Sequence, residues 1–255
     1  MKRKHIIITS LLLLAIIPLI SIFIYITNDR EMVTVAQSQT ETFSFANDNE
    51  INIAVVGDSW VANEKLDQYI KSELEKSNID SEIISYGYPG RKTKDIYQKI
   101  TSEPAIKKVD LMVIVAGVND SAGHIGKDFY SHHMKNIVTF ANINSIYPFV
   151  LELPEFSIET NANRFLSQVK HTIYRYLFDK GKLDNINEYR SELETTLSNS
   201  DLLYSIIPFG NIIDDYSSSK DLYIDPWHLN DKGNETLGTY IGQFIAKQLE
   251  DKASS

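Results

Sequence analysis

The sequence predicts one α/β domain, a three-layer α/β/α sandwich in which helices cover both faces of a parallel sheet of about five strands. Two observations lead to this prediction. Short, nearly continuous apolar runs are typical of strands that are buried on both faces of a sheet. These runs alternate with segments of helical periodicity, which indicates the crossover connections that join parallel strands. The chain has 255 residues, 43% of them hydrophobic, which suits one such domain and a terminal segment.

The expected elements follow one another from residue 51 to residue 251. Apolar runs predict strands at residues 51–56, 82–86, 110–116, 147–153 and 203–208. Helical spacing predicts helices at residues 61–76, 93–101, 127–142, 158–179, 186–198 and 231–251. Residues 117–126 are expected to form a loop. In such sheets ligands bind beyond the carboxyl ends of the strands, so a site is expected in the segments that follow the strands.

The first thirty residues predict a membrane anchor. Three cations, Lys2, Arg3 and Lys4, precede an uncharged apolar run at residues 6–26. At about 1.5 Å per residue this run is long enough to cross the apolar core of a bilayer, and the cations place its N-terminal end in the cytoplasm. We expect a cytoplasmic tip and transmembrane signal anchor at residues 1–27, a polar linker at 28–50, and a folded domain at 51–251 outside the cytoplasm, in a single-pass protein of the cell membrane.

A cleaved signal peptide, with secretion of the domain, is the alternative reading of this segment. The apolar region of a signal peptide is usually about 7–15 residues long, which is shorter than this run. The nearest candidate cleavage site, Thr34-Val35-Ala36, lies well past the end of the run. These features favour the anchor.

Composition and charge exclude several kinds of site. The chain has no cysteine, which rules out disulfides, thiolate catalysis and cysteine-bound zinc. Its net charge is −9 and it lacks basic clusters, which argues against nucleic acid as a partner.

The segment Gly57-Asp58-Ser59-Trp60 directly follows the first expected strand. Ser59 would lie at a strand-to-helix turn, where a helix N-terminus helps to stabilise developing negative charge. Gly57 permits the tight backbone path that such a turn needs. An Asp-Ser pair before a helix is also an ordinary N-cap signal. The pattern is not the Gly-x-Ser-x-Gly nucleophile elbow, which disfavours the α/β-hydrolase family.

Three further segments carry groups suited to acyl transfer. Asn119, after the third expected strand, can direct an amide donor at an oxyanion. Gly90, in the turn after the second strand, can offer its backbone N–H. Asp225 lies three residues before His228, so its carboxylate can hold an imidazole that acts as a general base. Taken alone, these segments also fit ordinary turns and a helix start with a surface histidine.

In this order and at these positions, the four segments resemble the signature blocks of the SGNH (GDSL-like) hydrolase family over residues 51–250. Gly57-Asp58-Ser59 resembles the first block, with Trp60 where leucine is frequent. Gly90 resembles the glycine of the second block, for which Gly87 is the alternative. The third and last blocks are matched by Gly117-x-Asn119-Asp120 and Asp225-x-x-His228.

The resemblance implies a flavodoxin-like sandwich and a Ser59–His228–Asp225 triad. It also implies an oxyanion hole formed by the Ser59 N–H, the Gly90 N–H and the Asn119 side chain. No metal and no cofactor are implied.

Other residues near these segments are weaker candidates for a role in the site. Trp60 and Trp227 adjoin the site residues and form a hypothetical substrate wall, although each can instead pack beneath its own loop. His124 could line the cleft. His132 and His133 are adjacent on an expected helix, where side chains point about 100° apart, so they do not easily share a metal ion.

These observations predict a serine esterase that acts outside the cytoplasm. The leading substrate is an O-acyl group, with acetyl favoured, on a surface polysaccharide or wall glycan, because an outward-facing enzyme meets envelope polymers first. One alternative is an O-acyltransferase, which would need a membrane partner that supplies an activated acyl donor. Others are a lipase or thioesterase and, outside enzymes, a polysaccharide-binding or scaffold domain.

Overall fold

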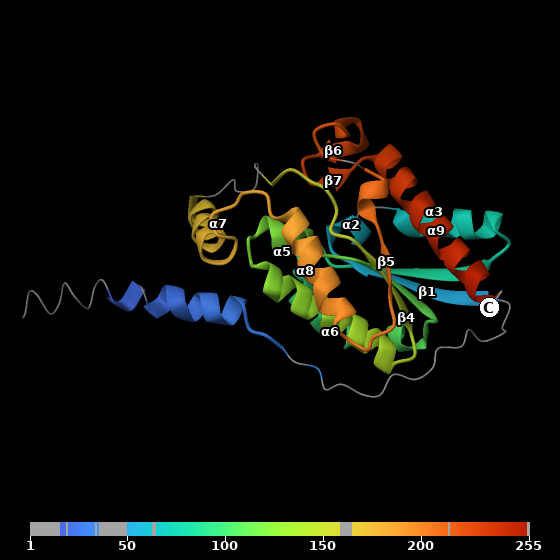
Figure 1. Ribbon diagram of the computed structural model, residues 1–255, viewed down its shortest axis with the longest axis horizontal. Helices are drawn as coiled ribbons and strands as arrows, with labels where there is room; N and C mark the ends of the chain where they lie inside the picture. Colours follow the sequence, from blue (N-terminus) through green and yellow to red (C-terminus); the bar gives the residue numbers. More distant parts are fainter. Residues whose placement is uncertain are drawn as a thin grey trace, which may run out of the picture. The chain divides into compact units, whose positions relative to one another are not determined.

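The computed structural model describes residues 16–18, 20–33, 35, 50–62, 65–158, 165–213 and 215–253 (Figure 1). The chain divides into two units, Met1–Val33 and Thr34–Ser255. In the first unit, residues 16–18 and 20–29 are helical. None of the described helices combines the length and the hydropathy that a membrane span requires. Residues 6–15 and 19 of the predicted anchor, and most of the predicted linker, lie outside the described residues.

A five-stranded parallel sheet forms the centre of the second unit, which confirms the predicted fold class. The strands lie in the order β2-β1-β3-β4-β5, and each neighbouring pair is parallel. They are β1 (Glu50–Gly57), β2 (Asp80–Gly87), β3 (Leu111–Val115), β4 (Tyr147–Leu151) and β5 (Ser205–Ile207). β3 and β4 are buried along their whole length, as expected for strands covered on both faces.

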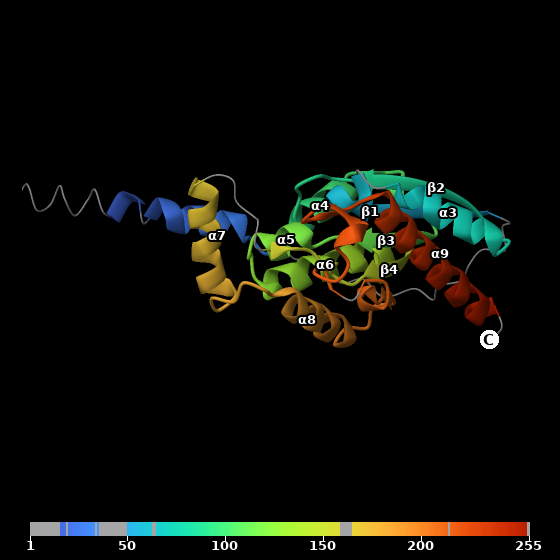
Figure 2. The ribbon, with the colours of Figure 1, turned by 90° about the horizontal axis from the view of Figure 1, so that it is seen from above.

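Helices cover both faces of this sheet. The helices in the described part of this unit are α2 (Ser59–Ala62), α3 (Leu66–Lys76), α4 (Thr93–Ile100), α5 (Val118–Ala122), α6 (Lys127–Ile143), α7 (Phe165–Phe178), α8 (Ile186–Ser198) and α9 (Asp231–Ala253). α3 packs against α9, and α6 packs against α4 and α8. Figure 1 shows α3 and α9 on one side of the sheet and α6 and α8 on the other, and Figure 2 shows α3 and α9 side by side. The second unit is therefore a three-layer sandwich.

The winding of the sheet reverses at β1. β2 lies on one side of β1 and β3 on the other, so the connections leave β1 and β3 on opposite faces. Such a reversal opens a crevice at the carboxyl ends of the two central strands. Gly57 of β1 and Val115 of β3 are paired at that end, so the segments that carry Ser59 and Asn119 meet there.

The structure departs from the sequence prediction in its short elements. The predicted helix at 61–76 is two helices, α2 and α3, and the predicted loop at 117–126 contains α5. The predicted last strand, at residues 203–208, is shorter in the structure, where β5 covers only Ser205–Ile207. A two-stranded hairpin, β6 (Tyr223–Asp225) and β7 (His228–Leu229), was not predicted. Elements of two to five residues have too few positions to show a period, so their sequences carry little signal.

Candidate active site

The turn between β1 and α2 presents Ser59 at the carboxyl edge of the sheet. The chain leaves β1 at Gly57 and enters α2 at Ser59. A Cβ atom on Gly57 would lie 2.0 Å from the Val115 carbonyl oxygen and 2.6 Å from a methyl carbon of Val61. Only glycine fits at this position, because both neighbours belong to the packed core. The close approach of β1 to β3 thus holds the Ser59 backbone in place.

A hairpin brings Asp225 and His228 together. Asp225 ends β6 and His228 begins β7. The Asp225 Oδ1 atom accepts hydrogen bonds from the backbone N–H of Trp227 at 2.7 Å and of His228 at 2.9 Å. The other carboxylate oxygen, Oδ2, lies 2.8 Å from Nδ1 of the His228 ring. The carboxylate is therefore oriented by the hairpin backbone while it holds the imidazole.

The same contacts affect the pKa of the Asp225 carboxyl group. Its partial burial raises the pKa, but hydrogen bonds from the His228 ring and from the Trp227 and His228 amides outweigh burial and hold the pKa below its usual range. Asp225 is accordingly anionic near neutral pH, which favours a proton on Nδ1 of His228 and leaves Nε2 free to accept one.

The His228 ring connects this hairpin to Ser59. Its Nε2 atom lies 2.9 Å from the Ser59 hydroxyl oxygen, within hydrogen-bond distance. Ser59, His228 and Asp225 therefore form one hydrogen-bonded chain, although 166 residues separate Ser59 from Asp225 in the sequence. An imidazole so placed can take the hydroxyl proton while the oxygen attacks an electrophile, and a carboxylate so placed can stabilise the resulting imidazolium.

Two backbone N–H groups at the site have no acceptor among the residues that the structure describes. The structure records no hydrogen bond from the N–H of Ser59 or of Gly90 to any described residue. Gly90 has a φ of 70° and lies in a turn closed by the bond from the Arg91 N–H to the Tyr88 carbonyl, 3.1 Å long. A turn with Pro89 second and a positive φ at the third residue is a type II turn, which favours glycine there. Apart from Gly90 itself and its two neighbours in the chain, no atom of the described residues lies within 4 Å of the position that a Gly90 Cβ would occupy.

Gly87, the alternative to Gly90, has a packing role. A Cβ atom on Gly87 would lie 2.2 Å from the backbone nitrogen of Ala62. Gly87 therefore allows β2 to lie against the end of α2, whereas Gly90 stands in an open turn with a free donor. The geometry favours Gly90 as the residue that supplies an N–H.

Asn119 links the segments after β1, β2 and β3. Its side-chain amide donates to the Arg91 carbonyl at 3.2 Å and to Oδ2 of Asp58 at 3.4 Å. The first distance is at the upper end of the normal range and the second is beyond it, so the amide can exchange either contact for a stronger acceptor. Gly117, at the start of the same segment, has a φ of 121°, and a Cβ there would lie 2.4 Å from the Tyr130 ring.

Asp58 and Asp120 are buried carboxylates that hydrogen-bond to the segments of the site. The sequence patterns assigned neither residue a role. Asp58 is fully buried and accepts a bond from the Trp60 N–H at 3.1 Å. Burial raises the pKa of Asp58 to about 6. The hydrogen bond from the Trp60 N–H and the electrostatic effect of His228 lower this pKa, but burial outweighs them. A buried carboxylate next to a turn is costly unless it is hydrogen-bonded, which suggests that its contacts to Trp60 and Asn119 hold the turn in shape.

Asp120 ties the loop of Gly90 to the segment of Asn119. It is fully buried, and its two oxygens accept bonds from the Thr93 N–H at 2.9 Å and the Thr93 hydroxyl at 2.7 Å. Burial raises the pKa of Asp120 to about 7, while the two bonds from Thr93 oppose the rise. The only sequence signal for this role was an acidic residue directly after Asn119.

The prediction that Trp60 forms part of a substrate wall is wrong. This side chain is fully buried, and its ring packs edge-on against Phe209 with centroids 6.1 Å apart. The residue after Ser59 points into the core beneath the site, as the helical geometry of α2 directs it. Trp227 is partly buried, and its indole N–H donates to the Ser157 carbonyl at 2.9 Å, so a contact with substrate at Trp227 stays a prediction.

His124 belongs to a buried network rather than to the cleft. It is 3% exposed, and its Nδ1 lies 2.7 Å from Oδ2 of Asp179. The Asn185 side chain donates to the same carboxylate oxygen at 2.6 Å and to the Ser121 carbonyl at 3.0 Å. These bonds fasten the segment after α5 to the segment between α7 and α8. The expectation that His124 lines the cleft is therefore wrong.

His132 and His133 are not arranged as a metal site. His133 is fully buried and its ring bonds to the Phe129 carbonyl, while burial lowers its pKa to about 4. Within the described part of the chain, no group of three or more His, Cys, Asp or Glu side chains is placed to hold a metal ion.

Comparison with known proteins extends the description of the fold. No protein-family model matches the chain, and no curated protein matches its sequence. Solved structures do match. The lipase/acylhydrolase from Enterococcus faecalis has a TM-score of 0.59 at 18% identity, over 78% of this chain and 96% of that one. The chain has the fold of this solved structure.

Two further solved structures, one of them a GDSL-like lipase, have the same fold. An acetyl xylan esterase has a TM-score of 0.57 at 16% identity, over 76% of this chain and all (100%) of that one. A GDSL-like lipase from Bacteroides thetaiotaomicron has a TM-score of 0.55 at 13% identity, over 77% of this chain and 88% of that one. The matches cover 88% or more of each of these three solved chains, whose shared fold we call the GDSL-type fold.

Proposed function

We propose that this protein is a serine esterase with Ser59 as nucleophile, His228 as general base and Asp225 as the group that orients the imidazole. The observation that carries the proposal is the continuous chain of hydrogen bonds, 2.9 Å from Ser59 to His228 and 2.8 Å from His228 to Asp225. The GDSL-type fold adds support, because the similar structures described above include a lipase/acylhydrolase and an acetyl xylan esterase.

The reaction is acyl transfer from an ester to water. The Ser59 hydroxyl oxygen bonds to the ester carbonyl carbon while its proton passes to Nε2 of His228. The alkoxy group leaves and takes that proton from the imidazolium. A water molecule then attacks the acyl-enzyme, gives its proton to His228 and releases the carboxylic acid as the proton returns to Ser59. Each half of the reaction restores the starting protonation state.

The oxyanion that forms in each half is held by three donors. The unpaired N–H groups of Ser59 and Gly90 supply two of them, and the Asn119 amide supplies the third by leaving Asp58 or the Arg91 carbonyl. Removing one such donor typically lowers the rate by about 10²–10³-fold.

The substrate we propose is an O-acyl group, with acetyl favoured, on a surface polysaccharide or wall glycan. This rests on the N-terminal apolar run, for which a transmembrane anchor and an extracytoplasmic domain remain our proposal, and on the acetyl xylan esterase among the similar structures. The exposed position of Asp225, whose side chain is 48% accessible, suits a site that receives a polymer. Transfer of the acyl group to a sugar hydroxyl is the second candidate within the same chemistry.

Labelling with a fluorophosphonate tests the nucleophile. The full chain, purified in detergent, should react covalently at Ser59, because the reagent reports a serine activated by a base. Ser59→Ala should abolish labelling. The control is Ser102→Ala, which removes an exposed serine far from the triad and should label like the wild type. Labelling that persists in Ser59→Ala would contradict the proposal.

A further inference from the structure

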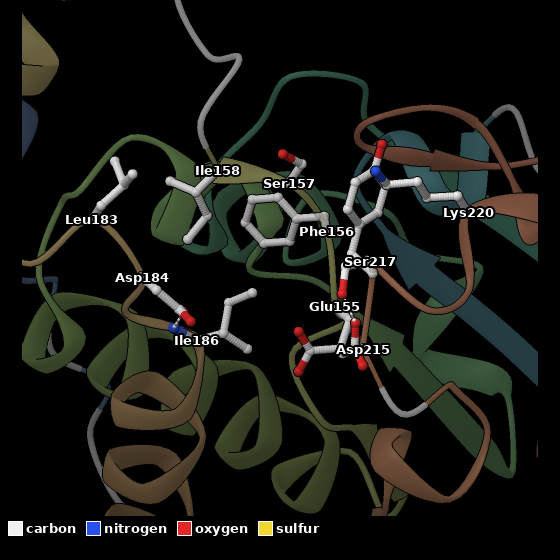
Figure 3. Close-up of a pocket in the computed structure, with 11 residues that line it drawn as sticks. Glu155, Phe156, Ser157, Ile158, Leu183, Asp184, Ile186, Asp215, Ser217 and Lys220 are labelled. Atoms are coloured by element: carbon white, nitrogen blue, oxygen red, sulfur yellow. Dashed lines mark hydrogen bonds between the residues drawn. The ribbon is translucent and has the colours of Figure 1, made fainter.

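A pocket of about 430 Å³ is formed partly by the segment that hydrogen-bonds to the hairpin of Asp225 and His228. Figure 3 shows the residues that line it. Three segments line it: the one after β4, the one between α7 and α8, and the loop that precedes β6. Ser59, Asp225 and His228 are not among its lining residues. In Figure 3, Phe156 lies between Asp184 and Ile186 on one side and Ser217 and Lys220 on the other. The volume is within the range of about 300–1,000 Å³ that small-ligand sites occupy.

Hydrogen bonds fasten the wall of this pocket to the hairpin that carries Asp225 and His228. The Ser157 N–H donates to the Pro226 carbonyl at 2.8 Å, and the Trp227 indole donates to the Ser157 carbonyl at 2.9 Å. The Tyr223 hydroxyl donates to the Glu155 carbonyl at 2.7 Å. A ligand held in the pocket is therefore held at a fixed position relative to the hairpin.

The pocket combines an apolar surface with polar groups that have no partner. Phe156, Ile158 and Ile186 are buried apolar side chains. The structure records no hydrogen bond from the hydroxyls of Ser157 and Tyr216 to any described residue. The Lys220 ammonium nitrogen lies 5.9 Å from the ring centroid of Tyr216, and no hydrogen bond or ion pair joins it to another residue in the described part of the chain. A few convergent polar groups on an apolar surface are characteristic of a site that fixes the orientation of a ligand.

The carboxylates that line the pocket are already engaged. Glu155 pairs with Arg190 at 2.7 Å, and Asp215 accepts bonds from the Ser217 and Ser218 side chains, which lower its pKa to about 2. Asp184 accepts a bond from the Ile186 N–H. Three negative carboxylates disfavour an anionic ligand, and their polarity disfavours a bare acyl chain.

A neutral sugar ring has the complementary chemistry. Its C–H faces are apolar and its hydroxyls both donate and accept, so it can contact Phe156 while its edge bonds to Lys220, Tyr216 and Ser157. We propose that this pocket binds a sugar residue of the acylated glycan and so presents the ester to Ser59. The proposal rests on the esterase function above and names the substrate class of the same site.

The test compares sugar esters with an ester that carries no sugar. The full chain in detergent is assayed on O-acetylated oligosaccharides of xylose, glucose and N-acetylglucosamine, and on p-nitrophenyl acetate. Lys220→Met and Tyr216→Phe should lower the ratio of kcat/KM for the best oligosaccharide to kcat/KM for p-nitrophenyl acetate, by about tenfold for Lys220→Met, because a hydrogen bond to a charged group is lost. The control, Lys107→Met, changes an exposed lysine of the segment before β3 and should leave the ratio unchanged.

Ratios within twofold of the wild type in both pocket variants, or an equal fall in Lys107→Met, would overturn the proposal. Hydrolysis of p-nitrophenyl acetate without hydrolysis of any acetylated oligosaccharide would overturn it as well. A separate measurement, saturation-transfer NMR of the same oligosaccharides with Ser59→Ala, reports binding without turnover. Binding that is weakened by Lys220→Met supports the pocket even if Ser59 proves not to be the nucleophile, and absence of binding contradicts it.

Discussion

Asp225 illustrates how a single residue defines the geometry of the site. Its Oδ1 atom accepts two backbone N–H groups of the hairpin, and its Oδ2 atom holds the His228 ring. The backbone bonds fix the carboxylate whether or not the ring is charged. The orientation of the carboxylate therefore does not depend on its charge. A substitution that removes only the charge tests what the charge contributes to catalysis.

Asp225→Asn is predicted to lower kcat on p-nitrophenyl acetate by roughly 10³–10⁴-fold with little change in Tm. The amide oxygen can still accept the two backbone N–H groups, but the amide no longer favours the tautomer of His228 that accepts the Ser59 proton. Steady-state kinetics and thermal denaturation provide the two readouts. Asp221→Asn is the matched control, because Asp221 lies on the same loop and pairs with Lys232 away from Ser59. A loss below tenfold in Asp225→Asn would count against the role of Asp225.

Asp120 should make stability depend on pH. Burial raises its pKa from 3.8 to about 7, so the folded state binds this proton more tightly than the unfolded state does. The group therefore favours folding fully at a pH below its unfolded pKa, and that contribution is lost as the pH rises through about 7. Asp120→Asn does not titrate, so the Tm of the variant minus that of the wild type should rise between pH 5 and pH 8. A difference that stays constant over this range would show that Asp120 is not perturbed.

At the scale of elements, the close packing of β1, β2 and α2 determines where Ser59 lies. The apolar runs predicted these strands correctly, because a strand buried on both faces needs apolar residues at every position. The hairpin β6–β7 was not predicted, since its few residues are held by contacts with the segment after β4 and not by local preference. Trp60 packs against Phe209, a residue distant in sequence, and a linear pattern does not show such a contact.

Gly57→Ala should destabilise the fold by about 1–3 kcal/mol, since the added methyl group would overlap the Val115 carbonyl and the Val61 side chain in a packed core. Gly210→Ala is the matched control. Apart from Gly210 and its two neighbours in the chain, no atom of the described residues lies within 4 Å of the position of a Gly210 Cβ. This substitution should therefore change stability by less than about 0.5 kcal/mol. Urea denaturation of both variants measures the free energy of unfolding. Equal losses in the two variants would show that the contact between β1 and β3 is not the cause.

At the scale of the whole molecule, the sheet gathers residues that are far apart in the sequence. Ser59, Asn119 and His228 follow or precede different elements, and the reversal of winding at β1 brings their segments to one crevice. The order of the four motifs indicated this grouping from the sequence, as did their places at the ends of strands. The supporting roles of Asp58 and Asp120 were beyond sequence reasoning, because nothing in a linear pattern shows that a carboxylate is buried or which amide it meets.

The central claim is that Ser59 and His228 act as one unit in ester hydrolysis. The most direct test is kcat/KM on p-nitrophenyl acetate for the full-length wild type, Ser59→Ala, His228→Ala and the double variant. We expect each single substitution to lower kcat/KM by at least about 10³-fold and the double variant to lose little more, because residues that act together are not additive. Activity in Ser59→Ala above a tenth of the wild-type value, or losses that multiply in the double variant, would contradict the account.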